Sequence, residues 1–333
     1  MAMGATTTAV TSRIAATISK VAMGVCACAL AVGLTGCALT TPSRAEVEHE
    51  TIEPTLSGTD LVEDGYLTVA MDTTDAPQAL TDANGEPSGY YGDLARAFAQ
   101  RTGLKVKVVS AGSAAASVSE GKADIFIGAQ ANAAADGLTV FGSVVENGSA
   151  LYAKTADGSN EVPTVSATAL SGATVAVQDA SASQDALNRA GIDASQTVFE
   201  NVNQCFEALD AGEVQYVACD ATAGSYLARA YQGVVFVGTI SSVSSYGIAA
   251  PADSAVASEI ASVYEEMLDD GTIDAIHTIW YGGMSLSLSD TLLSGVTLSS
   301  ESATNDDAEN TANGEVEGED GGQAIGESIN SIG

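Results

Sequence analysis

The chain has 333 residues, of which 46% are hydrophobic and only 5% aromatic, so any core is built mainly from alanine and aliphatic side chains. Its formal net charge of -32 argues against a nucleic-acid partner, because phosphate would be repelled. The length suggests about two domains.

The N-terminus has the pattern of an export signal. Arg13 and Lys20 precede an apolar stretch at 21–32, which is short for a membrane span. The residues at 34–37, Leu-Thr-Gly-Cys, resemble a bacterial lipobox, in which Cys37 would be lipidated. An ordinary secretory signal or a short anchor is the alternative. We expect a signal peptide at 1–36, an acidic tether at 37–60, and an extracytoplasmic protein anchored to the bacterial cell membrane by lipidated Cys37.

A first α/β run lies within residues 65–130. Leu67, Val69 and Met71 alternate as in a half-buried strand, and the spacing of apolar residues over 94–101 predicts a helix that ends near Gly103. A strand at 104–108, a second helix ending at 121 and a short apolar strand at 124–128 follow.

A second α/β run begins at residue 174. It predicts strands at 174–178, 197–200, 214–219, 234–238 and 246–250, with helices at 181–190, 203–211, from 220 to 231, at 254–270 and from 273 to 280. Strands that alternate with helices predict largely parallel sheets with ligands at their carboxyl ends. Residues 285–333 are expected to form an acidic, low-complexity, disordered tail, although a weak alternation after Met284 could add a strand.

Several stretches carry a family resemblance in the family's order and spacing. They are LTVAMDTTDAP (67–77), GYYGDLARAFA (89–99), EGKADIFIG (120–128), LSGATVAVQ (170–178), ALDAGEVQYVACD (208–220), YGIAAP (246–251) and DGTIDAIHTIWYG (270–282). The chain resembles a family 3 solute-binding protein of an ABC transporter, of the polar amino-acid type. The resemblance implies an α/β, two-lobed type II periplasmic-binding fold, with lobe 1 at 61–147 and 251–284, lobe 2 at 148–250, and a ligand cleft between lobes joined by two hinge segments. It also implies an ABC permease as partner.

In that family an Arg holds the ligand's carboxylate, an acid holds its ammonium group, and aromatic side chains surround its middle. Here the Arg position falls on Asp136, aromatic positions fall on Asp75 and Gln78, the lobe 2 Gly-Thr becomes Ala180-Ser181, and the acid is kept as Asp220. The resemblance therefore predicts a cleft without its anion clamp and aromatic walls. The candidate ligand-binding residues are Asp72, Asp75, Gln78, Gln130, Asp136, Ser181 and Asp220.

These carboxylates suggest a small polar ligand that is cationic, such as an amine without a free α-carboxylate, because clustered carboxylates are unfavourable without a cation. The other interpretation is that they are solvated aspartates of an acidic protein whose cleft has drifted. The chain would then be a degenerate module that acts as a surface sensor or scaffold. An enzyme of the dehydratase kind on this fold lacks a supporting acid/base pair, and we expect no enzymatic activity and no cofactor.

Two cysteines remain beyond the signal and the lipobox. Cys205 near a helix start and Cys219 at a strand end could form a disulfide in an oxidising compartment, or could be two free buried thiols. No metal site is expected, because His49 lies in the tether, His277 lies in the last predicted helix, and no Cys/His cluster exists.

Overall fold

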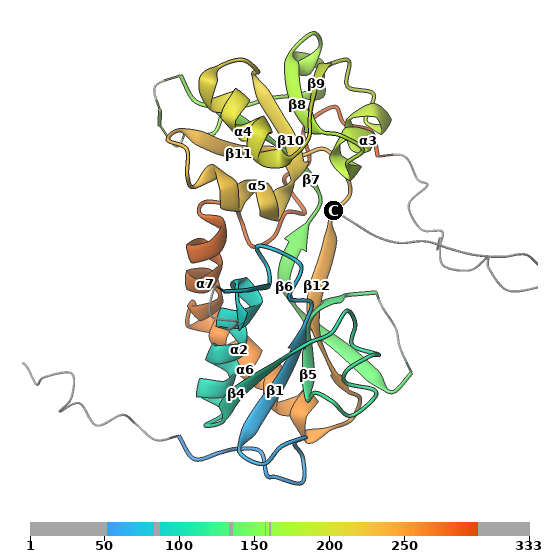
Figure 1. Ribbon diagram of the computed structural model, residues 1–333, viewed down its shortest axis with the longest axis vertical. Coiled ribbons are helices and arrows are strands. Elements are labelled where there is room, and N and C mark those ends of the chain that lie inside the picture. Colours follow the sequence, from blue (N-terminus) through green and yellow to red (C-terminus); the bar gives the residue numbers. More distant parts are fainter. Residues whose placement is uncertain (1–51, 83–86, 133–135, 157, 160, 299–333) are drawn as a thin grey trace, which may run out of the picture.

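A computed structural model describes residues 52–82, 87–132, 136–156, 158–159 and 161–298. Two five-stranded sheets form two lobes, one above the other in Figure 1. The first sheet has the strand order β4-β1-β5-β12-β6. Its strands are β1 (Tyr66–Met71), β4 (Lys105–Ser110), β5 (Ile125–Gln130), β6 (Leu138–Asn147) and β12 (Ser244–Pro251).

The second sheet has the order β11-β7-β10-β8-β9. Its strands are β7 (Ser149–Lys154), β8 (Thr174–Gln178), β9 (Ser195–Phe199), β10 (Tyr216–Asp220) and β11 (Val234–Thr239). In both sheets three neighbouring strands are parallel and two strands run antiparallel to their neighbours. The two sheets confirm the predicted two-lobed α/β fold.

Helices pack against each sheet. The first lobe carries α2 (Tyr90–Arg101), α6 (Ala255–Asp269) and α7 (Thr272–Tyr281). The second lobe carries α3 (Ala182–Arg189), α4 (Val202–Ala211), α5 (Ala221–Ala228) and the 3-10 helix η1 (Ala167–Leu170). A short hairpin, β2 (Leu80–Thr81) with β3 (Pro87–Ser88), precedes α2.

The chain crosses between the lobes at Gly148 and again at 240–243, between β11 and β12. Strand β12 pairs with β5 and β6, so it belongs to the first lobe, as Figure 1 shows. The predicted boundary at residue 250 is therefore wrong. The apolar pattern of 246–250 identifies a strand but not the sheet that accepts it, and Ile248 is fully buried in the first lobe.

Two local predictions also fail. The alternation in β1 predicted a half-buried strand, but the strand is buried on both faces. Leu67, Val69 and Met71 pack in the cluster that contains residues of α2, and Ala70 packs with Val118 and Phe126 in a separate cluster. The segment before Gly121 forms turns instead of a helix. There the hydroxyl of Ser117 donates to the carbonyl of Ser113, and such serine bonds compete with regular helix formation.

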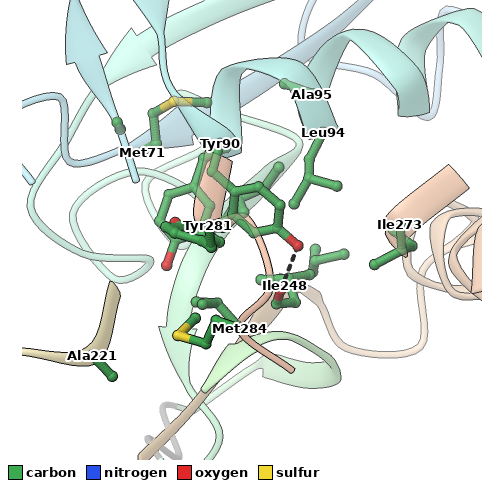
Figure 2. Packing of buried hydrophobic residues seen from close by; sticks show 14 of the residues in the cluster. Met71, Tyr90, Leu94, Ala95, Ala221, Ile248, Ile273, Tyr281 and Met284 are labelled. Carbon is green, nitrogen blue, oxygen red and sulfur yellow. Dashed lines mark hydrogen bonds between the residues drawn. The ribbon is translucent and has the colours of Figure 1, made fainter. Parts of the chain in front are cut away.

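An aromatic cluster fixes the packing of the first lobe. The Tyr90 hydroxyl donates to the carbonyl of Val144 at 2.6 Å, and its ring lies 5.1 Å from that of Tyr281, centroid to centroid (Figure 2). His277 on α7 completes the cluster, 5.0 Å from the Tyr281 ring. This packing anchors α2 and α7 beside each other.

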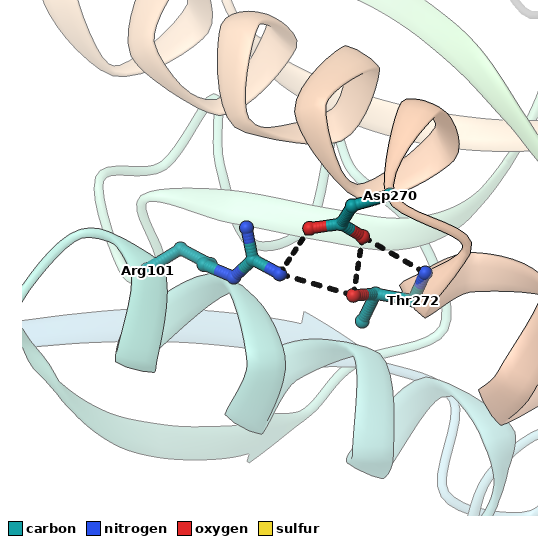
Figure 3. A network of polar contacts seen from close by, with 3 residues as sticks. All are labelled: Arg101, Asp270 and Thr272. Atoms are coloured by element: carbon teal, nitrogen blue, oxygen red, sulfur yellow. Dashed lines mark hydrogen bonds and ion pairs between the residues drawn. The ribbon is translucent and has the colours of Figure 1, made fainter.

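The other ends of these helices are joined by a polar network. Arg101 donates to Asp270 at 2.5 Å and to Thr272 at 3.0 Å, and Asp270 also accepts from the backbone N–H of Thr272 (Figure 3). Thr272 and Arg101 lower the pKa of Asp270 to about 2. Because the carboxylate is exposed, we assign the network a positioning role for the α6–α7 corner.

Cys205 and Cys219 are free and buried, so the possible disulfide is not formed. Each thiol instead donates a hydrogen bond to a backbone carbonyl, Cys205 to that of Asn201 at 3.6 Å and Cys219 to that of Asp220 at 3.5 Å. Burial raises the pKa of Cys205 to about 11 and that of Cys219 well above its ordinary value, which keeps both protonated.

The two flanking regions are partly structured. Leu56, within the predicted tether, is buried, and the N–H of Thr55 reaches the carbonyl of Thr102 at 3.4 Å. The prediction of a disordered tail is wrong for residues 285–298, because Leu288 is buried in the cluster that contains the Tyr90 ring and Leu293 is buried in a cluster of the second lobe. Cys37 and residues 299–333 lie outside the described residues.

Candidate functional site

A cavity of about 410 Å³ lies between the lobes. The first lobe contributes the loop after β1, the start of α2 and the hinge ends of β6 and β12, and the second lobe contributes the N-terminus of α5. The lining residues are Asp75, Ala76, Gln78, Tyr91, Asn147, Asp220, Ala223 and Tyr246. Three predicted site residues, Asp75, Gln78 and Asp220, thus come together here.

The loop after β1 is shaped by its own polar groups. Asp72 accepts hydrogen bonds from the backbone N–H and the hydroxyl of Thr74, at 3.0 and 2.7 Å, and these bonds lower the pKa of Asp72. The N–H of Ala79 bonds to the carbonyl of Asp75 at 2.8 Å. Asp72 therefore builds the turn, while Asp75 lines the cavity.

Gln78 connects the two lobes. Its Nε2 donates to the hydroxyl of Thr222 at 2.9 Å, from the first lobe to the second. Its side chain is 6% exposed, and its Oε1 has no hydrogen-bond partner among the described residues. The cavity wall therefore holds a buried acceptor that is unpaired.

Asp220 is held rigidly at the N-terminus of α5. Its Oδ1 accepts from the Thr222 hydroxyl at 2.8 Å and from the N–H groups of Thr222 and Ala223, both at 3.2 Å. Its Oδ2 accepts from Asn147 Nδ2 at 2.6 Å. Because each carboxylate oxygen offers about two acceptor positions, Oδ2 keeps capacity for one more donor.

The cavity is electronegative. Partial burial raises the pKa of Asp75, and repulsion from Asp220 and Asp72 raises it further. Burial raises the pKa values of Tyr91 and Tyr246, and the carboxylates of Asp75 and Asp220 raise them further. No lysine or arginine is among the residues that line this cavity, within the described part of the chain.

The expected loss of aromatic walls is wrong. Tyr91 and Tyr246 border the cavity, although they come from α2 and β12 instead of the loop positions now held by Asp75 and Gln78. Tyr91 fits only because residue 128 is glycine, since a Cβ there would lie 2.8 Å from the tyrosine ring. The paired tyrosines of the GYYGD stretch were the available signal: Tyr90 enters the core and Tyr91 reaches the cavity.

A second cavity of about 370 Å³ adjoins the first and extends into the second lobe. The two share Asn147, Asp220, Ala223 and Tyr246. Hydroxyl groups dominate its lining, from Ser149, Ser181, Ser183, Ser241, Ser242 and Ser244, and Arg189 adds a positive charge. Predicted Ser181 lies here, but its hydroxyl caps α3 by accepting from the N–H of Gln184 at 3.2 Å.

The remaining predicted residues lie elsewhere. Asp72, Gln130 and Asp136 line neither of these cavities, and both Gln130 and Asp136 are exposed. A larger cavity, about 710 Å³, lies between α5, β11 and residues 282–284, and none of the predicted residues lines it. We place the candidate site in the cavity of about 410 Å³, because it lies between the lobes and is lined by the carboxylates of Asp75 and Asp220.

The described ranges offer neither a metal site nor a membrane-spanning helix. There, no group of three or more His, Cys, Asp and Glu side chains is placed to hold a metal ion. Among the same residues, no helix has the length and apolar character that crossing a membrane requires.

Two α/β lobes joined by crossing segments around a polar cavity define a two-lobed binding protein of the type II periplasmic class. The sequence supports the same class, because residues 67–283 match the bacterial extracellular solute-binding proteins, family 3. The chain belongs to this family. Because the family is extracellular, the protein is located outside the cytoplasm. No curated protein sequence matched the chain.

Several solved structures share the fold. A polar amino acid ABC uptake transporter substrate-binding protein from Streptococcus thermophilus is 18% identical, with a TM-score of 0.56, over 66% of this chain and 86% of that one. The L-cystine solute receptor of Neisseria gonorrhoeae, unliganded and open, is 18% identical, with a TM-score of 0.54, over 66% of this chain and 93% of that one. An ancestral cationic amino acid solute-binding protein is 24% identical, with a TM-score of 0.52, over 65% of this chain and 96% of that one.

Proposed function

We propose that this solute-binding protein takes up a small cationic, amine-type solute in the interlobe cavity and delivers it to an ABC permease. In this proposal Cys37 carries the lipid anchor, the protein is not an enzyme, and no cofactor takes part. Ligand binding and lobe closure are linked, because a ligand that contacts both lobes stabilises their closed arrangement.

The observation that carries the proposal is the balance of free donors and acceptors. Asp75, Gln78 Oε1 and Asp220 Oδ2 all have acceptor capacity. One N–H of each amide is already used, since Gln78 Nε2 bonds to Thr222 and Asn147 Nδ2 bonds to Asp220. A solute that supplies N–H donors and positive charge fits this wall, whereas a carboxylate would meet like charges.

The aromatic side chains support the same ligand class. Tyr91 and Tyr246 border the cavity and give it apolar walls for the carbon part of an amine. Aromatic ring faces also attract ammonium groups. The solute would therefore combine a charged, multi-donor end with a short hydrocarbon body.

Arg189 gives a second candidate its support. A zwitterionic amino acid could place its ammonium group between Asp75 and Asp220 and extend its carboxylate into the adjoining cavity, where Arg189 and several serine hydroxyls lie. This ligand would need enough length to span the residues that both cavities share. It differs from the first candidate in requiring Arg189.

Isothermal titration calorimetry tests the proposal with 1,4-diaminobutane, a simple alkyl monoamine and glutamine as probes. We expect the amines to bind and Asp75→Asn to weaken them roughly ten- to hundredfold, the effect of losing one charged hydrogen bond. Asp136→Asn is the matched control, because this aspartate is exposed and lines neither cavity. Tighter binding of glutamine than of either amine, lost in Arg189→Ala, would instead establish the zwitterion.

The pH dependence adds a second readout. The pKa of Asp75 is raised in the unliganded protein, so a bound cation must displace a proton when the pH lies below that raised value. Amine affinity should therefore fall on acidification sooner than an ordinary aspartate would cause, and Asp75→Asn should remove this part of the dependence. If none of the probes raises the melting temperature, the degenerate sensor or scaffold becomes the better interpretation.

A further inference from the structure

The described chain continues beyond α7 and crosses to the second lobe a third time. Residues 283–298, here called the C-terminal strap, begin at the end of α7 in the first lobe. They reach β11 through the bridge of Leu292 with Thr239, and the start of η1 through the bridge of Ser294 with Ser166. In Figure 1 the strap is the red segment that leaves α7 and follows the second lobe.

The strap makes polar contacts beside both of the other crossings. The N–H of Leu288 donates to Glu146 Oε2 at 2.5 Å, and Glu146 is next to Asn147 at the end of β6. At the other crossing, the N–H of Thr239 donates to the carbonyl of Thr291 and the N–H of Leu293 donates to the carbonyl of Thr239, both at 2.9 Å. The strap therefore joins the end of β6 to the end of β11.

Apolar side chains anchor the strap at both ends. Met284 and Leu288 are 5% and 0% exposed and join the large core cluster, which contains the Tyr90 ring of the first lobe and the Tyr152 ring of the second. Leu293 is 5% exposed and joins the separate cluster of the second lobe. Gly238 makes room for this end, because a Cβ there would lie 2.6 Å from the carbonyl oxygen of Thr291.

We propose that the C-terminal strap is a third hinge element that limits how far the two lobes move apart. A hinge motion is normally absorbed by a few backbone dihedrals in the crossing segments. Here the same motion must also deform the strap, or separate Leu288 from Glu146 or Leu293 from Thr239. The strap thereby narrows the range of cleft geometries in the unliganded protein, whichever solute the cleft binds.

Two truncations test this without any ligand. Ending the chain after Met284 removes the strap, and ending it after Leu298 keeps the strap and serves as the matched control. Spin labels on Ser119→Cys and Thr197→Cys, exposed positions in the first and second lobes, report the interlobe distance. We expect the chain ending at Met284 to show a distance distribution roughly twofold broader than the chain ending at Leu298, since local restraints set the amplitude of such opening.

A point variant keeps the test decisive if the shorter chain fails to fold. Glu146→Ala in the full chain removes only the acceptor for the strap at β6, and we expect it to broaden the distribution in the same direction by a smaller amount. Hydrogen exchange of the Ile240 amide, which bonds to the carbonyl of Ser149 between the two crossings, should become faster in both variants. The proposal would be overturned if Glu146→Ala leaves both the interlobe distances and the exchange rate unchanged and the truncations give no contrary result. The truncations give none if their distance distributions are equal, or if the shorter chain does not fold.

Discussion

Acidification should destabilise this protein partly through His277, the buried histidine of α7. The side chain is 3% exposed, and its Nε2 has no hydrogen-bond partner within the described residues. It packs against the rings of Tyr90 and Tyr281. Burial lowers the pKa of His277 from 6.5 to about 4, with only a partial opposing effect from Asp274.

The sign and size follow from linkage between protonation and folding. A base whose pKa is lowered by folding contributes full stability above its unfolded pKa and loses it as the pH falls towards the folded pKa. Between pH 6.5 and about pH 4, the unfolded chain gains a proton that the folded protein does not take up. At about 1.4 kcal/mol for each pH unit, the loss for His277 amounts to about 3 kcal/mol.

Urea unfolding of the wild type and of His277→Phe, repeated from neutral pH down to the folded pKa, measures this loss. The replacement keeps an aromatic ring and removes the titrating group, so its free energy of unfolding should fall less on acidification, whatever its stability at neutral pH. Tyr281→Phe is the control. It removes a buried hydroxyl that has no hydrogen-bond partner among the described residues and does not titrate in this pH range. It should leave the dependence of the free energy of unfolding on pH unchanged. Parallel losses in the wild type and His277→Phe would refute the reasoning.

Two further predictions concern packing in the second lobe. Gly224→Ala should lower the free energy of unfolding by about 1–3 kcal/mol, because its Cβ would lie 2.3 Å from the Tyr152 ring and 2.6 Å from Cys219 Sγ. Urea titration measures this loss. Gly112→Ala is the control and should be nearly neutral, because no heavy atom lies within 4 Å of the Cβ that it adds. The second prediction is that Cys205 and Cys219 both react with a thiol reagent once the protein is unfolded, with no reductant added. If both cysteines react only after a reductant is added, they form a disulfide that the structure does not contain.

Local sequence signals predicted most elements because they depend on neighbouring residues. Helix α4 ends where Gly212 adopts a left-handed conformation with φ of 75°, and glycine at that position was the predicted stop. The alternation of strands and helices likewise predicted the α/β class. The sheet that holds β12 and the packing of the strap depend on contacts distant in sequence, such as Tyr246 with Val145 and Leu293 with Thr239, which local patterns do not encode.

The same distinction applies to the candidate site. Asp220 is the last residue of β10 and Asp75 lies in the loop after β1, so their positions at the cleft could be predicted from order along the chain. Tyr91, Asn147 and Tyr246 reach the cavity because α2, β6 and β12 converge there. Which polar atoms stay unpaired is also a property of the folded protein, and the Oε1 of Gln78, without a partner among the described residues, shaped the proposed ligand class.

Asp220 links the candidate site to the hinge. It caps α5 in the second lobe and accepts from Asn147, the last residue of β6 in the first lobe. A cation that binds at its Oδ2 would therefore act on a group that already holds the two lobes together at the first crossing. Glu146, the neighbour of Asn147, accepts from the strap. The end of β6 therefore contacts the acceptor for the ligand through Asn147 and carries the acceptor for the third crossing. If binding requires the lobes to rearrange, part of the binding free energy must deform the strap. A chain ending at Met284 should then bind the solute with altered affinity. In that shorter chain, Asp75→Asn should still weaken the binding.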